Sequence, residues 1–275
     1  MELYQGIILG VLQGLTEFLP VSSSGHLVLG QIFFGITDSQ LSFDISLHVG
    51  TLLAVVVVYA KDIWLILGSV SGFLSKAVSL KPVAHLFRED KNLQLAVFIV
   101  IGSIPTAVIG LAIKQFEDVL FTSEILVGAM LILTGTILWF SRKFYFSETK
   151  ANGFGIKQAV LIGITQGLAV IPGISRSGST IAAGMVLGLN RHTAAKFSFL
   201  LSLPAILGAE VLSVKDVLKD GLAFNSVTLY STIAAFITGL IALKILLSLV
   251  HSGRFHLFAP YCWLVGALVL ISKVI

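Results

Sequence analysis

The sequence predicts an all-α integral membrane protein with an inverted-topology repeat, about six transmembrane helices and two re-entrant helical hairpins. Three observations predict this fold class. First, 56% of the 275 residues are hydrophobic and only 12% are charged, a composition outside the range of soluble domains. Second, several apolar stretches approach or reach the roughly 20 residues that a helix needs to cross a bilayer. Third, two segments interrupt this pattern and match each other in sequence.

Six stretches have the composition of membrane-spanning helices. They are residues 42–60, 92–114, 122–141, 194–213, 227–249 and 256–273. An extension of the first stretch, from Lys61 to about Leu74, either continues as a long helix or lies in the membrane interface. The N-terminal residues lack the basic region and the cleavage site of a signal peptide, so the sequence predicts no leader that is removed.

Residues 3–35 and 156–189 do not fit the pattern of a single span. Each segment is apolar for one helical length, is then interrupted by Gly, Ser and Pro, and becomes apolar again. Irregular backbone at membrane depth is tolerated only where protein or a wet cavity satisfies its polar groups. Each segment therefore predicts a re-entrant helical hairpin, and a pair of short kinked spans is the alternative.

An internal repeat relates the two hairpins when residue i is aligned with residue i+153 without a gap. The matched pairs are Gly10 with Gly163, Gln13 with Gln166, Gly14 with Gly167, Leu15 with Leu168, Ser22 with Ser175, Ser24 with Ser177, and Gly25 with Gly178. The halves, residues 1–150 and 151–275 of one membrane domain, each hold a hairpin and three spans, and an odd number of spans inverts the second half. Inverted repeats with broken helices place a binding site near the midplane. We therefore expect the two serine-rich loops to meet there.

The basic residues predict an orientation rather than a nucleic-acid partner. The 18 Lys and Arg are scattered through short connections and do not gather on one face, so we expect no nucleic acid to bind. Under the positive-inside rule, a cytoplasmic connection from Lys76 to Lys91 places most of them inside and both termini outside. Cys262 is the only cysteine, which excludes an internal disulfide and a cysteine-based metal cluster.

The first hairpin carries a run of polar residues between Gln13 and His26. Gln13 and Glu17 are four residues apart, so on a helix they share one face and can hold one ligand together. A carboxylate inside an apolar hairpin is costly and indicates function, although a helix cap or an interfacial position would also explain Glu17. Glu17 and His26 both lie close enough in the sequence to activate a serine nucleophile.

Pro20 and the residues after it are suited to binding an anion. Pro20 cannot continue a helix, and the next residues offer hydroxyls, backbone N–H groups and tight turns. The N-terminus of the following helix adds a dipole that favours phosphate. The same serines would also serve if they only capped that helix. The candidate phosphate-binding residues of this hairpin are Gln13, Ser22, Ser24 and Gly25, and the candidate nucleophile is Ser23.

The second hairpin supplies a cation. Arg176 is the only Lys or Arg between Lys157 and Arg191, and a guanidinium is well shaped to bind phosphate through two hydrogen bonds. A structural ion pair between Arg176 and Glu17 is the competing interpretation. One carboxylate, one histidine, one arginine and several hydroxyls favour phosphate chemistry over transport of a neutral solute. The candidate phosphate-binding residues around the arginine are Ser175, Ser177, Gly178 and Thr180.

Other polar residues are weaker candidates. Asp44 and His48 are four residues apart at the start of a span, and either face the cavity or lie at the outer interface. Glu210, near the end of its span, is expected at the interface. The sequence contains no Walker loop, Rossmann fingerprint, HExxH or GxSxG motif, so nucleotide chemistry has no support.

Two motifs resemble those of a known family. Glu17, the stretch from Pro20 to His26 and the stretch from Pro172 to Gly178 are similar to the signature motifs of the bacterial undecaprenyl-diphosphate phosphatases, the bacitracin-resistance family. The resemblance spans the chain, with each motif in the expected half. The family has an acidic residue or Gln four residues before the Glu, so Gln13 is the Gln form. A mechanism that needs two carboxylates at these positions cannot operate here.

The resemblance implies hydrolysis of undecaprenyl diphosphate to undecaprenyl phosphate and inorganic phosphate, in the bacterial cytoplasmic (inner) membrane. The product is the carrier lipid for peptidoglycan and other envelope polymers. Because bacitracin sequesters the diphosphate, the resemblance also implies bacitracin resistance. It further supports a multi-pass protein whose site opens to the outer (periplasmic) side.

On this basis the expected catalytic residues are Glu17, Ser23, His26 and Arg176. Ser23 attacks the terminal phosphorus with Glu17 or His26 as the base, while Arg176 and loop N–H groups stabilise the developing charge. His26 as the nucleophile stays an alternative. A divalent cation, Mg²⁺ or Ca²⁺, could bridge the diphosphate to Glu17.

The expected partners are the polyprenyl diphosphate substrate and membrane lipids, and the sequence leaves a homodimer open. A transporter or flippase is the alternative from another class, because inverted repeats and broken helices are typical of secondary transporters.

Overall fold

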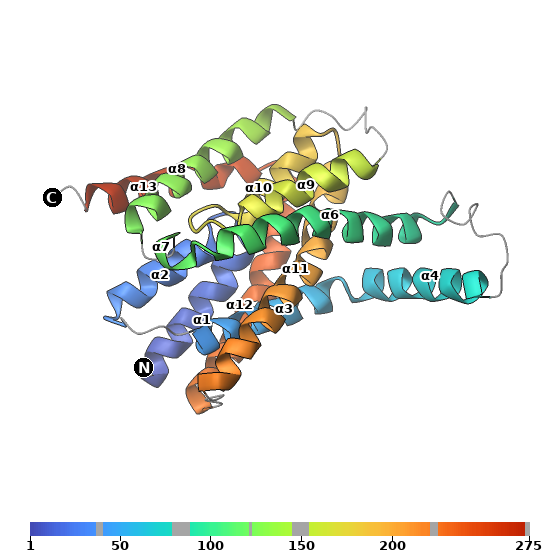
Figure 1. The fold of residues 1–275 in the computed structure, drawn as a ribbon. Coiled ribbons are helices and arrows are strands. Elements are labelled where there is room, and N and C mark those ends of the chain that lie inside the picture. The colour runs from blue at the N-terminus through green and yellow to red at the C-terminus, as the bar shows by residue number, and fades with distance from the viewer. Residues whose placement is uncertain (37–40, 79–88, 121–122, 145–153, 221–224, 273–275) are drawn as a thin grey trace.

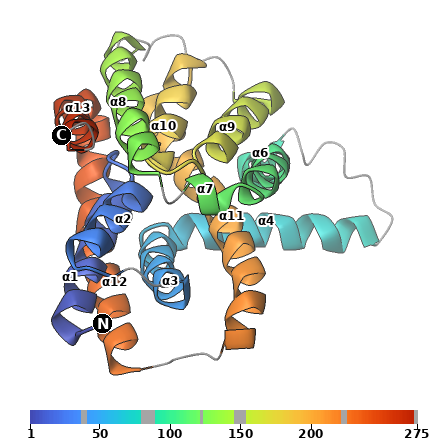
Figure 2. The ribbon, with the colours of Figure 1, turned by 60° about the vertical axis from the view of Figure 1, so that its left-hand side comes forward.

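The computed structural model describes residues 1–36, 41–78, 89–120, 123–144, 154–220 and 225–272, and within these ranges it contains no strand. Figures 1 and 2 show the helices gathered into one bundle, from which α4 projects. The helices of the first half are α1 (Leu3–Phe18), α2 (Ser23–Phe33), α3 (Leu41–Val58), α4 (Ala60–Val78), α6 (Lys91–Lys114), α7 (Glu117–Leu120), α8 (Glu124–Ser141) and η1 (Arg142–Phe144). Those of the second half are α9 (Ile156–Leu168), α10 (Arg176–Val186), α11 (Arg191–Asp220), α12 (Ser226–His251), η3 (Phe255–Phe258) and α13 (Ala259–Ile271).

Four of these helices are long and apolar enough to cross a membrane, namely α6, α8, α11 and α12. A fifth crossing would combine α3 and α4, which are bent by 76° at their junction. The extension after Lys61 therefore turns away from α3 instead of continuing straight. The predicted span over 256–273 corresponds to a shorter apolar helix, Phe255–Ile271. The described residues thus form a helical, multi-pass membrane protein.

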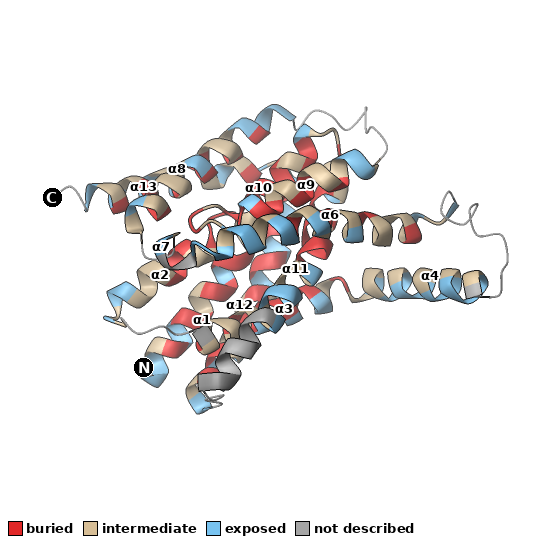
Figure 3. Ribbon diagram, viewed as in Figure 1, coloured by how far each residue is buried: buried red, intermediate tan, exposed pale blue. Residues whose placement is uncertain are grey.

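Exposed apolar side chains cover the outward faces of these helices. Val100 and Val108 on α6 are 63% and 64% exposed, and Leu264 on α13 is 60% exposed. Figure 3 shows exposed residues on the outer faces and buried residues toward the centre. The centre is packed by aromatic rings such as those of Phe18 and Phe199, whose centroids are 5.9 Å apart. A surface this apolar fits hydrocarbon surroundings rather than water.

Each of the two odd segments folds as two short helices joined by a break. In the first segment, the Tyr4 ring at the start of α1 lies 6.2 Å from the Phe34 ring at the end of α2, so the chain returns to its starting level. In the second segment, α10 packs back on α9, where a Cβ on Gly184 would lie 3.6 Å from Ile162. The predicted boundary between the halves, at residues 150 and 151, lies outside the described residues.

The first helix of each hairpin packs closely along a helix of the other half. A Cβ on Gly10 of α1 would lie 2.3 Å from the Ser231 carbonyl oxygen of α12. A Cβ on Gly163 of α9 would lie 2.1 Å from the Gly102 carbonyl oxygen of α6. Glycine permits both backbone contacts because any side chain would collide. These two glycines are one of the matched pairs in the internal repeat.

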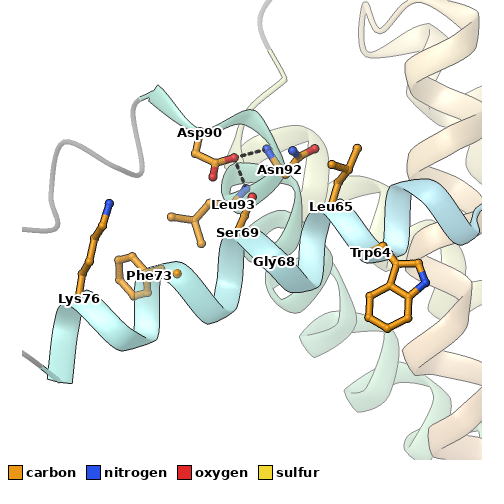
Figure 4. Close-up of a pocket in the computed structure, with 10 residues that line it drawn as sticks. Trp64, Leu65, Gly68, Ser69, Phe73, Lys76, Asp90, Asn92 and Leu93 are labelled. Atoms are coloured by element: carbon orange, nitrogen blue, oxygen red, sulfur yellow. Dashed lines mark hydrogen bonds between the residues drawn. The ribbon is translucent and has the colours of Figure 1, made fainter.

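The projecting helix α4 is tied to the start of α6. Asp90 caps α6 and accepts hydrogen bonds from the backbone N–H groups of Asn92 and Leu93 at 2.8 and 3.1 Å (Figure 4). A hydrogen bond from Ser69 on α4, together with these backbone bonds, lowers the pKa of the Asp90 carboxyl below its usual value. A cavity of about 410 Å³ lies between the two helices and extends along α4 from Trp64 to Lys76. Part of the Lys76–Lys91 connection, residues 79–88, lies outside the described residues.

Candidate active site

The two serine-rich loops meet at the centre of the bundle. The N–H of Gly173, in the loop before α10, donates to Ser22 Oγ in the loop before α2, at 3.1 Å. The Ser177 hydroxyl donates to the Phe18 carbonyl at 2.9 Å. Both contacts join residues of the two halves, so the loops form one structural unit as the sequence predicts.

A serine caps the N-terminus of the helix after each loop. Ser22 caps α2 by accepting a hydrogen bond from Gly25 N–H at 3.4 Å, and Ser175 caps α10 by accepting one from Gly178 N–H at 3.0 Å. The Ser22 backbone has a φ of +69°, the left-handed region that costs a non-glycine residue about 1–3 kcal/mol. This strain lies directly beside Ser23.

A threonine of α8 holds the second loop in place. Thr134 Oγ1 donates to the Gly173 carbonyl at 2.9 Å and accepts from Ser175 N–H at 3.1 Å. Gly173 has a φ of +94°, and a Cβ there would lie 2.5 Å from the Val127 carbonyl oxygen. Only glycine fits this position, because it tolerates the positive φ and the close approach of α8.

Glu17 is the centre of a polar cluster that unites both halves. Its carboxylate accepts hydrogen bonds at Oε2 from Ser23 Oγ, at 2.6 Å, and from Gln13 Nε2, at 3.1 Å. Oε1 forms an ion pair with Arg176 NH2. The Glu17 side chain is only 6% exposed, and a carboxylate buried this deeply needs such partners. The competing interpretation, an ion pair between Arg176 and Glu17, thus describes a contact that exists.

The two terminal nitrogens of Arg176 differ in their contacts. NH1 is buried and has no hydrogen-bond partner among the described residues, while NH2 holds Glu17. An unpaired buried guanidinium nitrogen is costly, so an anion beside it would be stabilised. Arg176 therefore holds Glu17 through one nitrogen and has a second, buried nitrogen without a partner among the described residues.

The cluster lines a cavity of about 540 Å³. The predicted site residues that line it are Glu17, Ser22, Ser23, Ser24, Ser175 and Arg176. The other predicted residues lie behind its wall: Gln13, Gly25, His26, Ser177, Gly178 and Thr180. Of these, Gln13 holds Glu17, and Gly25 and Gly178 form the helix caps. The Thr180 hydroxyl donates to the Arg176 carbonyl at 2.7 Å, which supports the backbone that carries the guanidinium.

His26 points toward α13 and lies outside the cavity lining. Its Nδ1 lies 2.8 Å from the Ser22 carbonyl oxygen, and its Nε2 lies 2.8 Å from the Tyr261 hydroxyl oxygen. A carbonyl only accepts, so in the neutral ring Nδ1 donates and Nε2 accepts from Tyr261. The two rings are stacked with centroids 5.7 Å apart. Both nitrogens of His26 are thus engaged with protein groups.

Residues that the sequence ranked low also line the cavity. Asp44 accepts a hydrogen bond from Gln31 Nε2 at 2.9 Å, and His48 Nε2 lies 4.0 Å from Glu17 Oε2. Glu210, expected at the interface, and Lys114 line it as well. The spacing of Asp44 and His48 inside an apolar span was the signal for these two. For Gln31 and Lys114 the sequence carries no comparable signal.

The cluster around Glu17 offers a divalent cation one protein carboxylate, that of Glu17. No group of three His, Cys, Asp or Glu side chains in the described ranges is placed to hold a metal ion. Glu17 fits as a single ligand, because Mg²⁺ in phosphate sites is commonly held by one or two carboxylates and by substrate oxygens.

These features define a class of protein: a multi-pass helical membrane protein with a buried serine, carboxylate and arginine cluster built from two loops. The chain belongs to the family described as bacitracin resistance protein BacA, whose family model matches residues 6–268. It is 56% identical over 272 residues to the undecaprenyl-diphosphatase of Desulforapulum autotrophicum, covering 99% of both chains. It is 52% identical to the protein of that name from Desulfosudis oleivorans, covering 98% of both chains. It is also 39% identical to the one from Methanosphaera stadtmanae, covering 100% of this chain and 99% of the relative.

Proposed function

We propose that this protein hydrolyses undecaprenyl diphosphate to undecaprenyl phosphate and inorganic phosphate. It thereby recycles the carrier lipid for peptidoglycan and other envelope polymers and confers bacitracin resistance. Relatives named undecaprenyl-diphosphatase that match over nearly the whole chain support this function. The observation that carries it is the 2.6 Å hydrogen bond from Ser23 Oγ to a carboxylate that also holds Arg176.

In the first step, Ser23 attacks the terminal phosphorus of the substrate. Glu17 Oε2 accepts the hydroxyl proton while Ser23 Oγ forms the new P–O bond. The bond from that phosphorus to the bridging oxygen breaks, and Glu17 returns its proton to the departing undecaprenyl phosphate. The second nitrogen of Arg176 binds the oxygens on which charge is concentrated.

In the second step, water releases the phosphate from the serine. Glu17 accepts a proton from the water as its oxygen attacks phosphorus, and the bond to Ser23 Oγ breaks. Glu17 then returns the proton to Ser23, which restores the resting site and leaves inorganic phosphate. Glu17 is favoured over His26 as the base because Ser23 already donates to Glu17, whereas both nitrogens of His26 have other partners.

In this proposal Glu17 would hold a divalent cation, Mg²⁺ or Ca²⁺, when the diphosphate is bound. When bound, it would neutralise charge on the diphosphate oxygens. The protein would contribute the single carboxylate of Glu17, and its other ligands would come from the substrate and from water.

The proposal includes an arrangement in the membrane. The two halves, residues 1–150 and 151–275, are inverted repeats of a re-entrant hairpin and three spans. The reciprocal packing of α1 on α12 and α9 on α6 supports this symmetry. The distribution of basic residues supports termini outside and a site open to the periplasmic side of the inner membrane. The protein would work among membrane lipids as a monomer or a homodimer.

Phosphate release by the purified protein in detergent tests this function. Wild type should release inorganic phosphate from a polyprenyl diphosphate without any gradient, and Ser23→Ala and Arg176→Ala should lose it. Ser252→Ala is the matched control, because Ser252 is exposed at the end of α12 and does not line the cavity. This variant should retain phosphate release. Folded wild type that releases no phosphate with any divalent cation would shift the assignment to a transporter or flippase.

A further inference from the structure

The 540 Å³ cavity holds the cluster of Glu17, Ser23 and Arg176 and has small residues along one side. That side is formed by α6 and α11, which also contribute the polar residues Ser103, Thr106, Lys114, Ser202 and Glu210. Between these lie several small residues: Ala107 and Gly110 on α6, and Ala205, Gly208 and Ala209 on α11. The two glycines leave the most space between the helices. A Cβ on Gly110 would meet only Val170, at 3.8 Å, and a Cβ on Gly208 would have no described neighbour within 4 Å.

The two helices touch at one level and separate beyond it. A Cβ on Gly102 of α6 would lie 3.0 Å from the Leu201 side chain of α11, so the helices are in close contact there. Gly110 and Gly208 come about two turns later on their helices, and there no comparable contact exists among the described residues. Figures 1 and 2 both show α11 running away from α6 toward its C-terminal end. The gap between them, lined by Ala107, Gly110, Ala205 and Gly208, is called the α6–α11 slot below.

The slot is the side on which the cavity opens. Ala107, Leu111, Lys114 and Gly208 line the cavity and are exposed. The opposite wall is closed, because Glu17, Ser22 and Leu27 are buried. Outside the slot, the neighbouring faces carry the exposed apolar side chains Ile104, Val108 and Leu207, which are 60%, 64% and 51% exposed. The opening therefore has exposed apolar side chains beside it.

This order of surfaces matches one kind of ligand. A cation beside the polar cluster, a passage between small residues and exposed apolar side chains at its outer end correspond to the head and tail of a lipid diphosphate. Cavities of this volume enclose ligands of drug size, so a chain of many isoprene units has to leave through an opening. Resting on the phosphatase function proposed above, we propose that the polyprenyl chain of the substrate leaves the cavity through the α6–α11 slot. The small residues there set how well long chains are accepted.

Substituting one glycine in the slot tests the proposal. Gly208→Leu places a branched side chain in the slot without a described clash, since no atom lies within 4 Å of its Cβ. Gly68→Leu on α4 is the matched control, because its Cβ also has no described neighbour within 4 Å and Gly68 does not line this cavity. The probes are isopentenyl, farnesyl and undecaprenyl diphosphates, and the measured quantity is kcat/KM for phosphate release.

The expected result is a loss that grows with chain length. Gly208→Leu should lower kcat/KM for undecaprenyl diphosphate at least about tenfold more than for isopentenyl diphosphate, mainly through KM. Gly68→Leu should change all three substrates by less than about twofold. An equal loss on every chain length, or no loss on the longest, would overturn the slot as the chain exit. Wild type inactive on all three substrates would instead contradict the phosphatase function itself.

Discussion

The loop before α2 and the loop before α10 share one capping contact and differ at the positions that carry chemistry. Ser22 and Ser175 both accept from a glycine N–H three residues on. In the alignment of the internal repeat, however, Glu17 corresponds to Val170, Ser23 to Arg176, and His26 to Ser179. The repeated positions thus build the scaffold, and the positions that differ supply a base and a nucleophile on one side and a cation on the other.

The two capping serines also differ in backbone conformation. Ser22 has a φ of +69°, whereas Ser175 has a φ of −72°, which any residue adopts easily. The strained backbone is in the loop that carries Ser23. Strain of this kind persists only where surrounding contacts hold it, and here Gly173 N–H and Gly25 N–H both bind Ser22 Oγ. The second loop therefore also holds the first one in shape.

The cation of the second loop gives the largest expected effect. Arg176→Lys keeps the charge but cannot hold Glu17 and an oxyanion with two nitrogens of one planar group. We expect kcat/KM for phosphate release to fall about 100-fold, roughly 2.7 kcal/mol of transition-state stabilisation. Arg191→Lys is the control, because Arg191, whose NH1 donates to the His251 carbonyl oxygen at 3.0 Å, does not line the cavity. Turnover within threefold of wild type would show that a point charge suffices.

The shared scaffold predicts equal sensitivity at matched glycines. Gly10→Ala and Gly163→Ala each drive a Cβ against a carbonyl oxygen, at 2.3 and 2.1 Å, so each should destabilise the protein by about 2 kcal/mol or more. Thermal unfolding in detergent measures the loss, with Gly208→Ala and Gly68→Ala as controls that have no described clash. A large loss at only one of the matched pair would contradict the proposed equivalence of the two halves.

The histidine of the first loop gives the smallest expected effect. His26→Gln should lower kcat/KM by about tenfold or less, because the ring supports the loop through Ser22 and Tyr261 and does not line the cavity. Tyr261→Phe removes one end of the same contact, so the double variant should lose less than the sum of the two single losses. A loss in His26→Gln as complete as in Ser23→Ala, with Tyr261→Phe harmless, would instead make His26 the base or the nucleophile.

Local sequence rules predicted much of this fold. The helix breaks at Pro20 and before Arg176 follow from proline, glycine and serine, whose effects act within a few residues. The repeat also predicted that the loops meet, and they do. The chain bends between α3 and α4 at a point where the sequence has no proline or glycine. The bend therefore could not be predicted from the local sequence.

The candidate site was less completely predictable. Glu17 and Arg176 stand out because charges are rare in apolar hairpins. Which side of a helix faces the cavity depends on packing between segments that are distant in the sequence. This packing places His26 against Tyr261, outside the cavity lining, and places His48 near Glu17. Neither contact has a signal within its own stretch of sequence.

The stereochemistry at phosphorus tests the central claim most directly. A substrate whose terminal phosphorus is made chiral with sulfur and oxygen isotopes is hydrolysed in labelled water, and the configuration of the released thiophosphate is determined. Attack by Ser23 followed by attack of water comprises two in-line displacements, so our account predicts net retention. Net inversion would mean that water attacks the diphosphate directly, and would contradict a phosphorylated serine.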